Sequence, residues 1–155
     1  MVVKKTFRLT KEGIAELQQE LDSLTAERAE IAESIRTARE FGDLSENSEY
    51  QSARVAQERN ESRIAEIEHI LQNAELIKTP HNSAKVQLGS KIKLCNSEGS
   101  TKDFQIVGTV EADPLNGKIS DESPIGRALI GKQESDEVEI KTSTETTIYK
   151  IVAIV

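Results

Sequence analysis

The sequence predicts an α+β protein, in which an N-terminal antiparallel α-helical coiled-coil hairpin precedes a C-terminal α+β domain. Between Thr10 and Ala74 the chain contains no proline, and apolar residues recur at steps of three and four. From Pro80 onward, β-branched residues, glycines and turn-forming residues take over. This change of period predicts two domains, one over residues 1–79 and one over residues 80–155.

The first half contains two stretches in which the three-and-four spacing alternates strictly, as it does in the contact seam of a coiled coil. Thr10 is a good N-cap for the first helix, and Gly42 is a good C-terminal breaker. The first seam consists of Ile14, Leu17, Leu21, Leu24, Arg28, Ile31, Ile35 and Ala38, and the second of Tyr50, Ala53, Gln57, Asn60, Ile64, Ile67, Leu71 and Ala74.

The two seams predict one register when the second helix folds back on the first. Facing residues then have numbers that add up to 88, from 14 with 74 to 38 with 50, so the hairpin turns near residue 44 with its tip at 41–47. Two facing layers, Arg28 with Asn60 and Ile31 with Gln57, are polar or mixed. We expect these layers to fix the register rather than to perform chemistry.

The second half predicts a small antiparallel or mixed sheet with one short helix. Ser123 and Pro124 fit an N-cap and a first helical position, and Gly131 fits the end of that helix. Period-two or β-branched stretches predict strands over 91–95, 104–110, 137–141 and 146–155.

Composition and motifs exclude several classes of function. A net charge of −7 restricts any contact with nucleic acid to a local patch. The sequence shows no glycine-rich phosphate loop, no zinc-ligand spacing and no motif for nucleophilic catalysis, so we expect no free-standing enzyme. No apolar run approaches the roughly 18 residues that span a bilayer, and no signal-peptide core follows Met1, so we expect a cytoplasmic protein without membrane contact.

Two acids, Asp43 and Glu46, lie three residues apart at the predicted tip, at the start of the second helix. One interpretation is structural: Asp at an N-cap with Glu three residues later is an acidic version of the capping box. The other is a pair of oxygen ligands for Mg²⁺, completed by a second macromolecule because two carboxylates hold this ion poorly on their own.

Three arginines lie close behind these acids. Arg39 and Arg54 both occupy e positions of the heptad, and Arg36 lies one turn from Arg39, so we expect the three on one flank of the hairpin. A solvated charged face is the ordinary interpretation, and Glu40 and Glu49 dilute the positive charge. The alternative is that these cations meet the phosphates of a strand whose end is delivered to the acids.

The segment from Ala38 to Tyr50, with its Gly42-Asp43-Leu44-Ser45-Glu46-Asn47 core, resembles the bacterial transcript cleavage factors of the GreA/GreB family, and is closer to the GreA branch. The resemblance continues in order through almost the whole chain, at 106–108, 111–113, 119–120, 123–125 and 128–132.

This resemblance implies a finger that enters the secondary channel of bacterial RNA polymerase and an FKBP-like domain that docks on the rim of that channel. It implies that Asp43 and Glu46 help to hold the second Mg²⁺ and the attacking water in the polymerase active centre, where the RNA 3′ end of a backtracked complex is hydrolysed. No cofactor would then be bound stably by the free protein, which we expect to be a monomer.

The resemblance also assigns binding residues. The RNA-binding basic patch maps onto Arg39 and Arg54, to which the edge geometry adds Arg36. The polymerase-contact loop maps onto Ser123, Pro124 and Ile125, where a helix cap explains Ser-Pro equally well.

Two other functions fit parts of the sequence. The same architecture suits a channel-binding inhibitor of the polymerase. The two tip acids argue against this inhibitor function. An FKBP-like domain also suits a peptidyl-prolyl isomerase, but such a site is normally an aromatic-lined pocket and this half of the chain offers only Phe104 and Tyr149. Phe41, next to the tip, either stacks on a base or covers the end of the coil.

Overall fold

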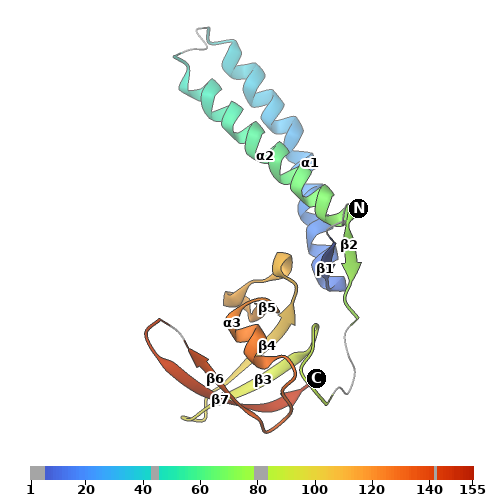
Figure 1. The fold of residues 1–155 in the computed structure, drawn as a ribbon. Coiled ribbons are helices and arrows are strands. Elements are labelled where there is room, and N and C mark those ends of the chain that lie inside the picture. Colours follow the sequence, from blue (N-terminus) through green and yellow to red (C-terminus); the bar gives the residue numbers. More distant parts are fainter. Residues whose placement is uncertain (1–5, 43–45, 79–83, 142) are drawn as a thin grey trace, which may run out of the picture. The chain divides into compact units, whose positions relative to one another are not determined.

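The computed structural model describes residues 6–42, 46–78, 84–141 and 143–155. Within these residues the chain forms two compact units. Ile14–Ala74 form a helical hairpin, and the segments before and after it form a globular unit. The two long helices lie in the N-terminal half of the chain and a curled mixed sheet lies in the C-terminal half, which confirms the predicted α+β class (Figure 1).

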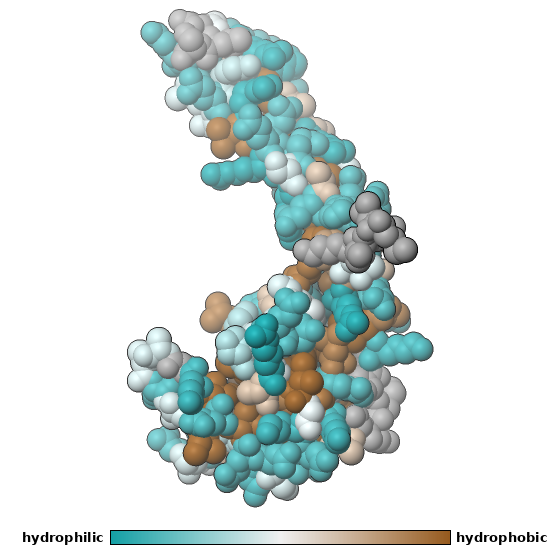
Figure 2. Space-filling view, viewed as in Figure 1, coloured by the Kyte–Doolittle hydropathy of each residue, from teal (hydrophilic) through white to brown (hydrophobic). Residues whose placement is uncertain are grey.

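The hairpin consists of α1 (Lys11–Arg39) and α2 (Ser48–Gln72). Burial follows the predicted seams, because every seam residue except Arg28 is buried or half-buried. Two side chains bridge the helices: the Asn60 amide donates to the Leu24 carbonyl at 3.0 Å, and the Asn47 amide donates to the Ala38 carbonyl at 2.7 Å. On the face that Figure 2 shows, the described part of the hairpin surface is mostly hydrophilic, with scattered hydrophobic side chains.

Both ends of α2 differ from the sequence prediction. The N-cap is Asn47, whose side chain accepts a hydrogen bond from the Tyr50 N–H at 3.1 Å, so the helix begins after Glu46 and this acid is not its third residue. The capping-box interpretation of the tip acids is therefore wrong for Glu46. At the other end the helix stops at Gln72, and Ala74 begins strand β2 (Ala74–Leu76) instead of closing the seam.

A two-stranded sheet joins β2 to β1 (Phe7–Leu9), and the Ile77 N–H donates to the Leu9 carbonyl at 2.7 Å just beyond it. Neither strand was predicted. Three residues are too few to show a period of two, so pattern analysis has nothing to detect.

The main sheet has five strands in the order β5-β4-β3-β7-β6. The β4–β5 pair is parallel and the other three pairs are antiparallel. The strands are β3 (Lys91–Asn96), β4 (Thr101–Val107), β5 (Lys118–Ser120), β6 (Glu137–Lys141) and β7 (Thr146–Ile154), with short 3₁₀ turns at η1 (Thr109–Glu111) and η2 (Pro114–Asn116).

Four of these strands match predicted ones, whereas β5 was missed. The strand predicted over 104–110 ends at Val107, because the chain turns into η1 two residues later. Helix α3 (Pro124–Leu129) has the predicted Ser123 cap: the Ser123 hydroxyl accepts from the Gly126 N–H at 3.1 Å.

The core of the globular unit is aliphatic and lies between the sheet and α3. Leu94, Ile106, Leu129 and Ile151 are fully buried. The buried cluster comprises Val86, Ile92, Leu94, Ile106, Ile119, Leu129, Val138, Ile140, Ile151 and Ile154.

The first turn of α1 is anchored in the globular unit by Glu111. This side chain is 4% exposed, and its carboxylate accepts hydrogen bonds from the Thr10 N–H at 2.8 Å and the Thr10 hydroxyl at 2.6 Å. The Thr10 hydroxyl in turn accepts from the Gly13 N–H at 3.0 Å, which confirms Thr10 as the N-cap. Gly13 leaves room for this arrangement, since a Cβ there would lie 2.2 Å from a Glu111 carboxylate oxygen.

Candidate functional site

The end of α1 is closed by three successive backbone hydrogen bonds, in which the N–H groups of residues 40, 41 and 42 donate to carbonyls three residues earlier. Gly42 has a φ of +101°, a conformation that suits glycine and ends the helix. Phe41 stands just before this break with its side chain 72% exposed. Asp43 lies outside the described residues, and Glu46 is exposed directly before the Asn47 cap.

Two of the three predicted arginines share one flank of the hairpin. The Arg39 guanidinium lies over the Tyr50 ring, 5.8 Å from its centroid, which links the end of α1 to the first turn of α2. Arg54 follows Tyr50 by four residues and therefore lies one turn further along the same face of α2. Its guanidinium donates to the Gln57 side chain at 3.4 Å.

Arg36 differs from these two because carboxylates already surround it. It pairs with Glu33, and its guanidinium also donates to Glu40 at 3.0 Å. Hydrogen bonding with Arg36 lowers the pKa of Glu33, and the same bond raises the pKa of Arg36. Two acids beside one arginine offset its positive charge, and the RNA-binding role of Arg36 stays a prediction.

Further from the tip, ion pairs connect the helices. Arg63 of α2 makes a two-bond contact with Glu20 of α1 at 2.8 and 2.9 Å, and Arg28 makes a similar contact with Glu61 at 2.7 and 2.9 Å. The hydrogen bond from Arg63 lowers the pKa of the Glu20 carboxyl. The Arg28–Glu61 pair is exposed and the Arg63–Glu20 pair is half-buried, and both belong to the scaffold that carries the tip.

The predicted polymerase-contact loop is partly structural. The Ser123 hydroxyl donates to the Ser120 carbonyl at 2.7 Å in addition to capping α3, and Ile125 packs against the core. Pro124 is exposed at the first helical position. Sequence reasoning missed a neighbouring feature: Leu115, in the η2 turn before β5, is 97% exposed.

The η2 turn holds Leu115 rigidly. The Asn116 side chain donates to the Asp113 carboxylate at 2.6 Å, and the Lys118 N–H donates to the Asp113 carbonyl at 3.0 Å. Gly117 follows with a φ of +76°, and a Cβ there would lie 2.7 Å from the Asp103 carbonyl. A nearly fully exposed leucine on a fixed turn is suited to contact with a partner, although the sequence contains no signal of its exposure.

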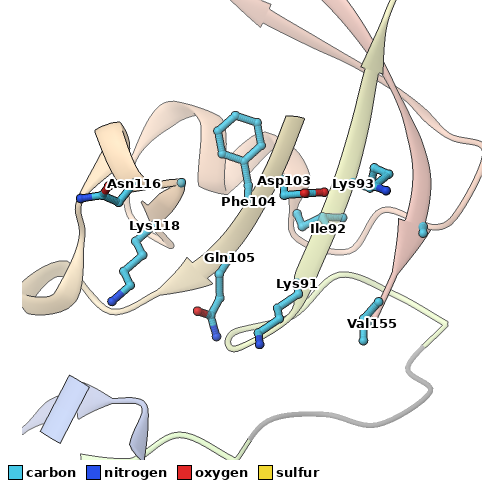
Figure 3. A pocket seen from close by; sticks show the side chains of 11 residues that line it. Lys91, Ile92, Lys93, Asp103, Phe104, Gln105, Asn116, Lys118 and Val155 are labelled. Carbon is cyan, nitrogen blue, oxygen red and sulfur yellow. The ribbon is translucent and has the colours of Figure 1, made fainter. Parts of the chain in front are cut away.

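A cavity of about 460 Å³ is lined by residues of β3, β4, β5 and β7 and of the turn before β5 (Figure 3). Lys91, Lys93 and Lys118 line it, but their charge is offset: Lys93 faces Asp103 across β3 and β4, and the Lys118 ammonium lies 4.0 Å from Glu111. This near-balance gives no strong attraction for an anion.

The same cavity does not resemble an aromatic-lined pocket. Phe104 is the one aromatic residue among its lining residues, and Figure 3 shows its ring pointing away from the side chains of Gln105 and Lys91. Phe104 packs against the hydrophobic core instead. The cavity therefore offers no support for prolyl isomerisation.

Within the part of the chain that the structure describes, no group of three or more His, Cys, Asp or Glu side chains is placed to hold a metal ion. Among the helices in that part of the chain, none combines the length and the apolar character needed to cross a membrane.

Comparison with known proteins defines first the class and then the family. Residues 7–76 match the family described as "Transcription elongation factor, N-terminal", and residues 80–155 match "Transcription elongation factor, GreA/GreB, C-term". The class is thus a transcription elongation factor of two parts. The chain belongs to the GreA/GreB family.

Individual relatives agree with this assignment. The chain is 47% identical to transcription elongation factor GreA of Acholeplasma laidlawii, over 93% of this chain and 92% of the relative. It is 42% identical to the GreA of Bacillus subtilis over 99% of both chains. Among solved structures, it aligns with GreA factor homolog 1 of Thermus thermophilus with 30% identity over 97% of this chain and 99% of that one, at a TM-score of 0.45.

Proposed function

We propose that the protein enters the secondary channel of bacterial RNA polymerase and stimulates the polymerase's own Mg²⁺-dependent cleavage of backtracked RNA. The observation that carries this proposal is the match to relatives named transcription elongation factor GreA, at 42 to 47% identity over nearly the whole chain. Cleavage at the RNA 3′ end would rescue arrested complexes. The protein would act as a monomer in the cytoplasm, as an accessory factor and not as an enzyme on its own.

The tip acids are the proposed catalytic and metal-binding groups. Glu46 is exposed at the end of the hairpin, where its carboxylate is accessible to a second macromolecule. Together with Asp43 it would supply oxygen ligands, which Mg²⁺ prefers, to an ion that belongs to the polymerase active centre. That ion would activate water for phosphodiester hydrolysis, while the two carboxylates orient it.

Arg39 and Arg54 are the proposed RNA-binding residues. The contact between Arg39 and Tyr50 supports their placement on one flank, with Arg54 one turn further on. Guanidinium groups bind phosphates through charge-assisted hydrogen bonds. Arg36 would contribute mainly by ordering this flank, since its two glutamate partners offset its charge.

The globular unit is the proposed docking part. Pro124 is exposed at the start of α3, while Ser123 and Ile125 hold that loop in shape. Leu115 provides an additional apolar contact at the other end of the three-residue strand β5. A partner that covers this side chain would remove apolar surface from water, which favours binding.

The test uses polymerase complexes halted in a backtracked state with labelled RNA. Asp43→Asn and Glu46→Gln should each remove stimulated release of short 3′ fragments while leaving polymerase affinity nearly unchanged, because each substitution removes a carboxylate without changing the size of the side chain. Glu58→Gln, which removes one exposed charge from the middle of α2, is the matched control and should retain stimulation.

Three results would count against the proposal. A wild-type protein that binds the complex and slows synthesis without releasing fragments would be a channel-blocking inhibitor. Full stimulation by Asp43→Asn would remove that carboxylate from the mechanism. Loss of stimulation in Glu58→Gln would show that net charge, and not the tip, is responsible.

A further inference from the structure

Phe41 is an aromatic residue that the described part of the hairpin leaves largely exposed. Its backbone is fixed, because the Phe41 N–H donates to the Ala38 carbonyl at 3.2 Å and Gly42 ends the helix immediately afterwards. Its side chain is 72% exposed, whereas the other aromatic residue of the hairpin, Tyr50, is half-buried and covered by Arg39. The described part of the hairpin thus presents one largely exposed aromatic ring, directly before the break at Gly42.

The described residues next to this ring are charged rather than apolar. Among the described residues of the hairpin, Val55 is the other exposed large hydrophobic residue, and it lies two turns into α2. Glu40 and Arg39 immediately precede Phe41, and both are exposed. An apolar docking surface normally contains several neighbouring apolar side chains, so a single ring among charges does not fit that pattern well.

An aromatic ring beside cations is instead the combination that binds single-stranded nucleic acid without regard to sequence. Arginines meet the phosphates, and a ring stacks on the π-face that every base possesses. Arg39 and Arg54 provide the cations, on the flank of the hairpin behind the tip. A factor that acts on RNA halted at any template position needs this kind of recognition, because base-edge hydrogen bonds would restrict it to certain sequences.

We propose that Phe41 stacks on a base of the extruded RNA 3′ segment and so holds the scissile phosphate near the tip acids. The inference rests on the proposed function and extends it from the phosphates to a base. Phe41 is then a positioning residue, since it acts on the geometry of the RNA and not on the bond that breaks. The alternative partner of the Phe41 ring is an apolar wall of the polymerase channel, and the experiment below distinguishes this wall from an RNA base.

The first part of the test compares side chains at position 41 in the cleavage assay. Base stacking corresponds to a factor of about 5 to 150 in binding or rate, so we expect Phe41→Ala to slow stimulated cleavage by about tenfold. Phe41→Trp should retain the rate and Phe41→Leu should lose it, because leucine is apolar but has no π-face. Full activity of Phe41→Leu, or a loss in Phe41→Trp, would overturn the proposal.

The second part removes the base instead of the ring. Backtracked complexes are assembled with RNAs that carry one abasic nucleotide at successive positions of the 3′ segment, and each rate is divided by the factor-free rate of the same RNA. At one position, wild-type stimulation should fall to the level of Phe41→Ala, while Phe41→Ala itself should be unaffected by the missing base. If the two losses multiply at every position, the ring and the base do not interact.

Polymerase affinity, measured by competition with labelled wild-type protein, provides the remaining control. It should be unchanged in Phe41→Ala; a tenfold loss would assign the ring to the channel wall and overturn the proposal. Circular dichroism should show intact folding, since the ring is exposed. If wild-type protein stimulates cleavage but Phe41→Ala matches it, this inference alone fails. If wild-type protein gives no stimulation, the proposed function fails instead.

Discussion

Gly13→Ala should destabilise the protein, although the same change normally stabilises a helix. Alanine is favoured over glycine within a helix by about 0.5 to 1 kcal/mol. Here a Cβ at position 13 would lie 2.2 Å from the Glu111 carboxylate oxygen, and that carboxylate is fixed by two hydrogen bonds from the buried Thr10. The added methyl group must therefore displace an anchored group.

The magnitude follows from the bonds that would be lost. Hydrogen bonds to a charged group contribute about 1.5 to 3 kcal/mol each, and two bonds on one carboxylate are not additive, so we take about 3 kcal/mol for both. Subtracting the helix preference leaves a net loss of about 2 kcal/mol, which lowers the melting temperature of a chain of this size by about 4 to 8 °C.

In the double mutant, the effect of Gly13→Ala on stability changes from destabilising to stabilising. In a Glu111→Ala background the obstacle is absent, so Gly13→Ala should raise stability by about 0.5 to 1 kcal/mol. Thermal and urea unfolding of the four proteins, together with hydrogen exchange of the Thr10 amide, provide the measurement. Stabilisation by Gly13→Ala in the wild-type background would show that the Glu111 carboxylate moves aside without losing its bonds.

Three further predictions concern the hairpin and the docking turn. The Arg63 hydrogen bond lowers the pKa of Glu20 below its ordinary value of 4.5. The stability that this pair contributes is therefore present above pH 4.5 and is lost as acidification protonates Glu20. Glu20→Gln should flatten the pH–stability curve in this acidic range. Asn60→Leu should raise the hairpin melting temperature, because the buried Asn60 side-chain oxygen has no hydrogen-bond partner in the described structure. Burying such an unpaired oxygen costs about 1 to 3 kcal/mol, which an apolar side chain avoids. A lower melting temperature would mean that the hydrogen bond from Asn60 to the Leu24 carbonyl contributes more than this cost. Leu115→Ser should weaken polymerase binding about tenfold or more without changing the melting temperature, as expected for an exposed anchor, and unchanged binding would exclude Leu115 from the docking surface.

The hairpin was predictable because its information is periodic and local. Seam residues recur over eight layers, so the facing register could be derived by arithmetic alone. The structure agrees within one helical turn: Arg28, predicted opposite Asn60, pairs with Glu61, and the Asn60 amide reaches the carbonyl of Leu24, one turn from Arg28. Repetition makes such a pattern robust to single exceptions, including the exposed Arg28.

What the sequence did not reveal depends on contacts between distant residues. Glu111 and Thr10 are 101 positions apart, so no local pattern indicates that one anchors the other or that Gly13 must be small. The start of α2 is similar: Asp43 and Asn47 are both good caps, and Asn47 has the additional bond to the Ala38 carbonyl across the hairpin. The roles of the tip acids and of the arginines remain predictions.

The constant register of the hairpin makes its length adjustable. In the predicted register facing residues add up to 88, so removing residues 17–23 from α1 and residues 65–71 from α2 deletes two complete layers and brings Ile14 and Leu24 into the seam spacing of neighbours. Each matched deletion would shorten the hairpin by about 10 Å without changing its tip. A graded set of such proteins would measure how long the hairpin must be for its carboxylates to stimulate cleavage.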